Sequence, residues 1–265
     1  FIGNIFMNCE TGFGDYSNNG LNTIYHNSFI NNFNDVEEDN HLNFWDNGYP
    51  SGGNYWNDYT GYDNNTDGIG DTPYEIEGGY NQDNYPLMHP FGLITELPHG
   101  WSFFSLPTNI SINFSDILVL YNDNFLTFQE AVDEGIISPF IFTWDRVVQQ
   151  YDFTDEIIPG YGYWIYTFDD CSLWTFNYER NFDDYISTLE SGWNVVGTEF
   201  DYPISKYYTL VNNYTWTEAI SLGIISDVLF GWDKMAQSYT FEDTFEPGEA
   251  YWMYAFQPCV LKRNT

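Results

Sequence analysis

The chain has 265 residues, and its 39 Asp and Glu against 6 Lys and Arg give a formal net charge of −33. This charge excludes the basic surface on which nucleic-acid binding depends, and it disfavours binding to anionic membranes. Phe, Tyr and Trp make up 21% of the residues, which supplies core-forming surface for two or three domains and argues against disorder. No apolar run approaches the length of about 18 residues that a membrane span needs.

Residues 1–48 carry short apolar runs, each bracketed by Asn or Gly, and similar runs recur about every 20–23 residues. This spacing predicts the coils of a parallel β-helix, in which apolar side chains stack inside and Asn side chains at the bends bond to the coils above and below. A set of unrelated antiparallel strands is the alternative, because alternation alone does not exclude it. The pattern is already under way at Phe1 with no initiator Met before it, so we expect a piece of a longer protein.

An oxygen-rich loop follows, with the form D-x-N-x-D-G-x-x-D. Side-chain oxygens alternate around the turn at Gly68, which is the ligand pattern that calcium prefers in proteins. Tyr74 stands where a bidentate Glu closes the full calcium loop. The alternative is a solvated acidic turn held by its own Asx hydrogen bonds. The predicted calcium ligands, with Ile69 acting through its carbonyl, are Asp63, Asn65, Asp67, Ile69 and Asp71.

The segment from Asn22 to Pro90 resembles the C-terminal end of secreted archaeal and bacterial right-handed β-helix proteins. This pectate-lyase-like repeat family includes the periplasmic copper-site maturation proteins. The resemblance implies a right-handed parallel β-helix over residues 1–92, but no activity, because such helices serve lyases, adhesins and surface layers alike. We expect Trp45 and Trp56 to close the end of the helix. Besides the Asn-rich runs, the resemblance rests on Trp45-Asp-Asn-Gly48, Gly52-Gly-Asn-Tyr-Trp56-Asn-Asp-Tyr59, Asp67-Gly-Ile-Gly-Asp-Thr-Pro-Tyr74 and Asp83-Asn-Tyr-Pro-Leu87.

The rest of the chain contains an internal repeat, which predicts two tandem β-rich domains at 97–180 and 186–265. Thr127 with Glu130, and Thr215 with Glu218, form capping-box patterns, so each copy is expected to hold one short helix. The copies resemble G-W-N-x-x-S-L-P … P-G-x-G-Y-W modules near the C-terminus of secreted archaeal and bacterial proteins, a resemblance that implies little about function. The repeated segments are Glu130–Ser138 with Glu218–Ser226, Trp144–Tyr151 with Trp232–Tyr239, and Pro159–Trp164 with Pro247–Trp252.

Several residues of the repeat are candidate sites. Trp144 and Trp232, or else Trp164 and Trp252, are candidate platforms for stacking on glycans, although aromatic positions shared by two copies are more often core. Cys171 and Cys259 occupy equivalent positions, and a disulfide between them requires Cα atoms within about 7 Å, as near a pseudo-twofold axis. Separate buried thiols are the default. Four sequons make Asn64, Asn109, Asn113 and Asn213 candidate glycosylation sites and favour an extracellular location.

No catalytic residue is predicted. Lyases on β-helices use a Lys or Arg base, and the first 145 residues contain neither. We therefore expect a non-catalytic, archaeal-type extracellular or cell-surface protein with calcium as its cofactor. It would have a structural or adhesive role, with itself, other surface proteins or glycans as partners. Assembly into a filament or surface layer through the coil edge at Phe1 is a hypothesis. The alternative is the carbohydrate-binding part of a polysaccharide-active enzyme. A metal-delivery role is disfavoured, because His, Met and Cys do not cluster.

Overall fold

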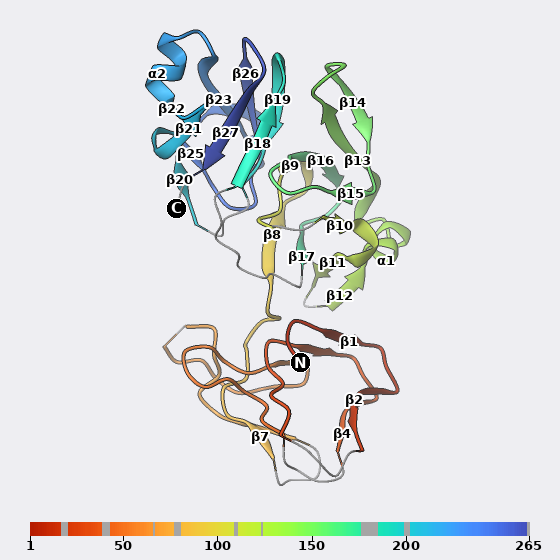
Figure 1. Ribbon diagram of the computed structural model, residues 1–265. Helices are drawn as coiled ribbons and strands as arrows, with labels where there is room; N and C mark the ends of the chain where they lie inside the picture. Colours follow the sequence, from red (N-terminus) through yellow and green to blue (C-terminus); the bar gives the residue numbers. More distant parts are fainter. Residues whose placement is uncertain are drawn as a thin grey trace. The chain divides into compact units, whose positions relative to one another are not determined.

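The computed structural model describes residues 1–16, 21–38, 43–65, 67–76, 81–108, 111–122, 124–175, 185–198 and 202–263. The chain divides into two compact units, 1–92 and 93–265 (Figure 1). Strands are the main regular secondary structure of both units, and the described residues include two short α-helices, both in the second unit. The predicted mainly-β class is therefore confirmed.

The first unit is a stack of coils whose strands pair in parallel. Strands β1, β3 and β5 form one three-stranded sheet, β2 and β4 form a second sheet, and β6 and β7 pair antiparallel. Parallel pairing between consecutive coils confirms the β-helix prediction over the antiparallel alternative. The strands are β1 (Ile5–Met7), β2 (Thr11–Asp15), β3 (Ser28–Ile30), β4 (Asn34–Glu38), β5 (Tyr55–Trp56), β6 (Tyr74–Glu75) and β7 (Gln82–Asp83).

A column of stacked aromatic rings fills the interior of these coils. The centroid distances are 4.9 Å from Phe6 to Phe29, 4.4 Å from Phe29 to Trp56 and 4.3 Å from Trp56 to Tyr74. Trp45 packs against the column with its ring 5.7 Å from that of Trp56, and both Trp side chains are buried. Trp56 is thus one level of the column, with a ring on each side of it.

A ladder of Asn side chains runs along one bend of the coils. Asn27 Oδ1 accepts bonds from the backbone N and the Nδ2 of Asn4, and Asn54 Oδ1 accepts the same two bonds from Asn27, all at 2.9–3.1 Å. Asp83 takes the next position, where its Oδ2 accepts from the backbone N of Asn54 at 2.6 Å and from Trp56 Nε1 at 3.0 Å. An amide both donates and accepts, whereas a carboxylate only accepts, so Asp83 ends the ladder. The predicted Asn contacts between coils are present.

The second unit contains two copies of one arrangement of antiparallel strands. The sheet orders β14-β13-β16-β9, β12-β11-β17-β8 and β10-β15 in copy 1 match β24-β23-β26-β19, β22-β21-β27-β18 and β20-β25 in copy 2. Each copy packs its two larger sheets around its own apolar core. Copy 1 begins with β8 and so includes residues 93–96, which lie between the predicted domain boundaries at 92 and 97.

The elements of copy 1 are β8 (Leu93–Leu97), β9 (Gly100–Phe104), β10 (Ile112–Asn113), η1 (Phe114–Asp116), β11 (Leu118–Tyr121), β12 (Asn124–Thr127), α1 (Phe128–Asp133), β13 (Ile137–Asp145), β14 (Gln150–Phe153), β15 (Glu156–Ile157), β16 (Tyr163–Thr167) and β17 (Cys171–Thr175). Those of copy 2 are β18 (Tyr185–Leu189), β19 (Gly192–Val196), β20 (Ile204–Ser205), η2 (Lys206–Tyr208), β21 (Thr209–Val211), β22 (Tyr214–Thr215), α2 (Trp216–Ser221), β23 (Ile225–Asp233), β24 (Ser238–Phe241), β25 (Thr244–Phe245), β26 (Tyr251–Ala255) and β27 (Cys259–Arg263).

Both predicted helices are present with their capping boxes. The Thr127 hydroxyl accepts from the backbone N of Glu130, whose carboxylate accepts from Thr127 N, and the second copy repeats this at Thr215 and Glu218. Gly135 follows the first helix at φ 73°, a conformation that favours glycine and ends the helix. The local signals at both ends therefore fix helices of six residues each.

The two copies pack against each other with reciprocal contacts. Gly197 N donates to Gly160 O at 3.0 Å, and the equivalent Ser105 N donates to Gly248 O at 3.1 Å. Equivalent positions also meet, because a Cβ atom added to Gly162 would lie 2.4 Å from the Cβ of its counterpart Ala250. Contacts exchanged in this way are those of a twofold axis, which here relates two halves of one chain.

Candidate functional site

An aromatic groove lies where the two copies meet. The hairpin β13–β14 of copy 1 forms one side, and strands β19, β23, β24 and β26 of copy 2 form the rest. The groove encloses about 370 Å³ and is lined by Trp144, Tyr151, Trp193, Phe230, Tyr239 and Trp252. We call these six side chains the aromatic groove.

The rings of the groove stand at right angles around a buried floor. Trp252 is 8% exposed, and the planes of Trp144, Tyr151 and Trp193 are inclined to its ring by 80°, 84° and 86°. The centroids of these three rings lie 4.9–6.1 Å from that of Trp252. Tyr151 and Trp193 remain 48% and 37% exposed, so solvent reaches the walls from outside. The arrangement is an open box of aromatic rings.

Polar contacts hold two walls of this box together across the copies. Trp144 Nε1 donates to the carbonyl of Trp193 at 2.9 Å. Gln149, at the turn of the same hairpin, binds both backbone groups of Trp193: its Oε1 accepts from N at 2.7 Å and its Nε2 donates to O at 3.0 Å. The walls are therefore pre-positioned, and the indole N–H of Trp144 already has a hydrogen-bond partner within the protein.

The predicted stacking residues Trp144 and Trp232 have matching roles. Trp232 Nε1 donates to the carbonyl of Trp101 at 2.8 Å, as Trp144 does to Trp193. Gln237 clamps Trp101 with the same pair of bonds, at 2.8 and 2.9 Å. Both predicted Trp residues thus tie one copy to the other, and only Trp144 lines the groove.

Sequence reasoning missed Trp193, Gln149 and Arg146. The available signal was the repeated pattern Trp-Asp-(Arg or Lys)-x-x-Gln, in which polar residues recur at an offset of 88 although they do not suit a core. Arg146 is 6% exposed and donates to the carbonyls of Thr188 and Val195, both at 2.6 Å. Such repeated polar residues mark contacts between the copies.

The groove carries no formal charge on its lining side chains at neutral pH. Burial, helped by the neighbouring Tyr239, raises the pKa of Tyr151 to about 12, so this phenol stays neutral. The remaining lining residues are Trp, Tyr and Phe. The lining side chains offer a ligand π-faces, and their polar atoms are phenol hydroxyls and indole N–H groups, of which that of Trp144 is bound to the carbonyl of Trp193.

The predicted calcium loop is held by hydrogen bonds of its own. Asp63 accepts from the backbone N of Asp67 and Gly68, at 3.2 and 2.8 Å, and Asp71 Oδ2 accepts from Asn64 N at 2.8 Å. The backbone N–H of Ile69 is the main cause that lowers the pKa of Asp67. Within the described residues, no three His, Cys, Asp or Glu side chains are close enough to share a metal ion. This conformation has the Asx bonds of the acidic-turn alternative, and calcium binding stays a prediction.

The carboxyl group of Asp83 is buried and is held by hydrogen bonds from its own coils. Burial raises its pKa to about 6, against the opposing effect of the bonds from Asn54 and Trp56. Its second oxygen accepts from Tyr85 N at 3.0 Å. Both carboxyl oxygens are therefore occupied by the coil that they close, which leaves the group as an end of the Asn ladder.

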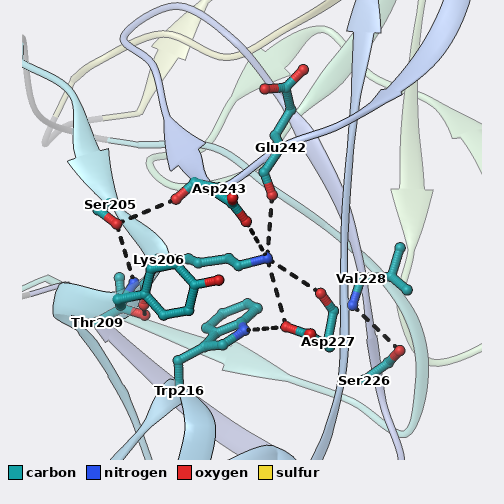
Figure 2. Close-up of polar contacts among 10 residues, drawn as sticks. Ser205, Lys206, Thr209, Trp216, Ser226, Asp227, Val228, Glu242 and Asp243 are labelled. Atoms are coloured by element: carbon teal, nitrogen blue, oxygen red, sulfur yellow. Dashed lines mark hydrogen bonds and ion pairs between the residues drawn. The ribbon is translucent and has the colours of Figure 1, made fainter.

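Copy 2 also buries a cation, Lys206, at the start of η2 (Figure 2). Its Nζ lies 2.7 Å from Asp243 Oδ1 and 3.6 Å from Asp227 Oδ1, and it donates to the carbonyls of Asp227 and Glu242 at 3.3 and 3.4 Å. The ring of Trp216 lies 5.6 Å away, and the Trp216 indole N–H donates to Asp227. The ammonium group is surrounded by partners, as expected of a structural charge.

The three cysteines are free thiols. Cys171 and Cys259 are buried on β17 and β27, which belong to different four-stranded sheets, and the candidate disulfide between them is not formed. Equivalent positions meet near Gly162 and Ala250 instead. Burial raises the pKa of Cys171 to about 12 and that of Cys259 to about 11, so neither is a reactive thiolate at neutral pH.

Three of the four candidate glycosylation sites are exposed: Asn64 in the loop, Asn113 on β10 and Asn213 before β22. Asn109 lies outside the described residues. Exposure makes a sequon accessible but does not show that it is modified, so glycosylation stays a prediction.

Comparisons with known proteins find one relationship, in the first unit. A family model described as periplasmic copper-binding protein (NosD) matches residues 1–61, which is under a quarter of the chain. No curated protein and no solved structure matches the sequence. In the part of the chain that the structure describes, no helix is long and apolar enough to cross a membrane. Over its first 61 residues, the chain is therefore similar to the NosD family, in agreement with the parallel coils found there.

Proposed function

We propose that the chain is a non-catalytic structural or adhesive protein that works outside the cytoplasm. The observation that carries this proposal is the reciprocal packing of the two copies in the second unit. Gln149 and Gln237 each clamp the backbone of the opposite copy with two hydrogen bonds. Such packing makes one rigid body from two small domains, which suits a spacer or platform. The similarity of residues 1–61 to a family described as periplasmic supports the location.

The test is fractionation of the native cells, followed by limited proteolysis of the recovered protein. We expect the protein outside the cytoplasm and the second unit to resist proteolysis as one piece. The double variant Gln149→Ala and Gln237→Ala should be cut into two halves. A cytoplasmic protein would contradict the location, and a wild type cut as readily as the double variant would contradict the rigid platform.

Self-assembly through the coils is part of the same proposal. Within the described residues, strand β1 ends the β1-β3-β5 sheet, and the end of a sheet can pair with a further strand of the same chain or of another one. Electron microscopy of the native protein at high calcium should show filaments or a layer. Dispersed monomers alone would argue against assembly.

We also propose that the loop at 63–71 takes up calcium by exchanging its internal hydrogen bonds for metal bonds. The ionised, exposed carboxylate of Asp67 and the charge of −33 support a divalent cation there. Calcium should raise the thermal midpoint relative to excess chelator, and Asp67→Ala should remove this rise. An equal midpoint with calcium and with chelator would reduce the loop to an acidic turn.

A carbohydrate-binding role ranks second. The aromatic groove favours it, since sugar rings stack on exposed aromatic faces. However, a sugar also needs partners for its hydroxyl groups, and the indole N–H groups of Trp144 and Trp232 are bound to backbone carbonyls. Binding to a glycan array that is lost in Trp144→Ala without loss of folding would bring this role to first place.

A further inference from the structure

The aromatic groove differs from a surface platform because its rings enclose a volume. Trp252 closes the bottom, and the rings of Trp144, Tyr151 and Trp193 stand nearly perpendicular to it. A flat sugar ring stacks best on one open face, whereas this box presents several rings to one small, compact group. Its volume of about 370 Å³ suits a small molecule rather than a polymer chain.

The chemistry of the lining selects against ligands that need many hydrogen bonds. The Trp144 N–H is bound to Trp193 O, and Gln149 occupies both backbone groups of Trp193. A hydroxyl-rich ligand would lose its water here without finding enough replacements, at a cost of about 1–3 kcal/mol for each unpaired group. The group that enters must therefore tolerate dehydration and must gain from π-faces.

Charge decides between a neutral apolar group and a cation. The lining adds no positive charge, and the chain as a whole carries −33. The faces of aromatic rings are electronegative, and a weakly hydrated cation enclosed by them gains about 0.5–2 kcal/mol from cation–π attraction. A quaternary ammonium group has no N–H to satisfy and combines its positive charge with an apolar methyl surface.

We propose that the aromatic groove is a binding site for a quaternary ammonium group, such as that of choline or a betaine. The proposal goes beyond a structural role, since it assigns a ligand class to the contact between the copies. Because each copy supplies walls of the box, binding requires both copies to be packed as described. The pre-positioned walls of Trp144 and Trp193 reduce the ordering that binding would otherwise require.

The experiment is a calorimetric titration of the whole chain at constant ionic strength with choline, and with 3,3-dimethylbutan-1-ol, its neutral isostere of the same shape. We expect choline to bind saturably and at least tenfold more tightly than the alcohol. Equal affinities would overturn the proposal in favour of a plain apolar pocket. Saturable binding of cellohexaose but not choline would overturn it in favour of a sugar site, and the absence of any binding would also overturn it.

The structure offers a matched control for the site. Trp193 lines the groove, whereas its counterpart Trp101, with the same backbone clamp and nearly the same exposure, 39% against 37%, stands at 80° to the ring of Trp164 in the equivalent place of the other copy. Trp193→Ala should weaken choline binding at least tenfold, and Trp101→Ala should change it less than twofold. Equal losses in the two variants would contradict the assignment. Tyr239→Leu, on the exposed rim, provides a second groove variant if Trp193→Ala does not fold.

Discussion

The coils of the first unit and the two copies of the second unit are both joined repeats, but their polar contacts run in different directions. In the coils, Asn4 bonds to Asn27 and Asn27 to Asn54, so each repeat donates to the next and the series needs an end. Asp83 supplies that end. In the second unit, each copy donates to the other, and the contacts close on themselves. A translational repeat is therefore most sensitive at its inner levels, whereas a twofold repeat has each of its contacts twice, once from each half.

The second unit also shows that equivalent contacts can differ in the side chains that make them. Arg146 reaches two carbonyls of copy 2, while its counterpart Lys234 reaches one carbonyl of copy 1, that of Glu96, at 2.9 Å. The different number of carbonyl contacts follows from the side chains, since a planar guanidinium group can donate from two nitrogen atoms at once, whereas an ammonium group is a compact charge on a single nitrogen. Lys234 compensates in part for the missing second carbonyl contact through an ion pair with Glu249 at 2.8 Å. The target is backbone in both copies, which permits the side chains to differ.

The largest expected effect is at the middle of the Asn ladder. Asn54 is fully buried and donates to the carbonyls of Ile24 and Trp45 at 2.9 and 2.7 Å. Asn54→Ala would leave these carbonyls and the backbone N–H of Asn27 unpaired, and we expect a loss of about 4 kcal/mol or more. Hydrogen exchange of peptides from the first unit measures it. Asn57→Ala, which removes an exposed contact to Asn31, is the control and should cost under about 1 kcal/mol. Similar losses would contradict the ladder's role.

The next effect separates the two anchors of the second unit. Arg146→Ala leaves the carbonyls of Thr188 and Val195 unpaired, so we expect a loss of about 3 kcal/mol. Lys234→Ala frees one carbonyl and removes the ion pair with Glu249, a carboxylate that water still reaches, and we expect about 1–2 kcal/mol. Denaturant unfolding, followed by hydrogen exchange of peptides from 93–265, compares them. Arg146→Lys should fall between wild type and Arg146→Ala, and a stability of Arg146→Lys equal to that of the wild type would show that the second carbonyl contact adds nothing.

A pH-dependent effect is expected at the end of the ladder. Burial raises the pKa of Asp83 to about 6, above its unfolded value, so the folded state binds the proton more tightly. The associated stability is present below about pH 4 and is lost as the pH rises through about 6, by about 3 kcal/mol at most. Asp83→Asn should remove this part of the pH profile of the first unit. Asp58→Asn, at an exposed carboxyl, controls for the lost charge, and an unchanged profile in Asp83→Asn would contradict the assignment.

The smallest effect concerns a position where the copies differ in polarity. Lys206 and Trp216 of copy 2 correspond to Phe114 and Phe128 of copy 1, whose rings lie 5.3 Å apart. The carboxylates of Asp227 and Asp243 are 65% and 69% exposed, so water can replace the ammonium group there, and its bonds to the carbonyls of Asp227 and Glu242 are long, at 3.3 and 3.4 Å. Lys206→Met should therefore change the free energy of unfolding by less than about 1 kcal/mol, while Lys206→Ala, which also removes packing, should cost more. Losses of similar size in both variants, well above about 1 kcal/mol, would show that the charge rather than the packing stabilises copy 2.

Much of this architecture was predictable because its signals are local or periodic. The recurrence of Asn-bracketed runs predicted parallel coils, and the pairs Thr127–Glu130 and Thr215–Glu218 predicted both helices. The direction of contacts between the copies was not predictable, because equivalence in sequence does not say which positions meet. Cys171 and Cys259 are equivalent yet lie on separate sheets, whereas Gly162 and Ala250 are equivalent and touch. For the same reason, the aromatic repeat indicated a core but not a groove.

The exchange of equivalent contacts gives the second unit the symmetry of a homodimer although one chain supplies both halves. Each copy carries both the hairpin that reaches across and the strand that receives it. A related chain with a single copy would therefore be self-complementary and would associate with its own twin. Duplication in tandem replaces that concentration-dependent association with an intramolecular one, in which a short connection sets a high effective concentration. The groove between the copies would then remain assembled at any dilution.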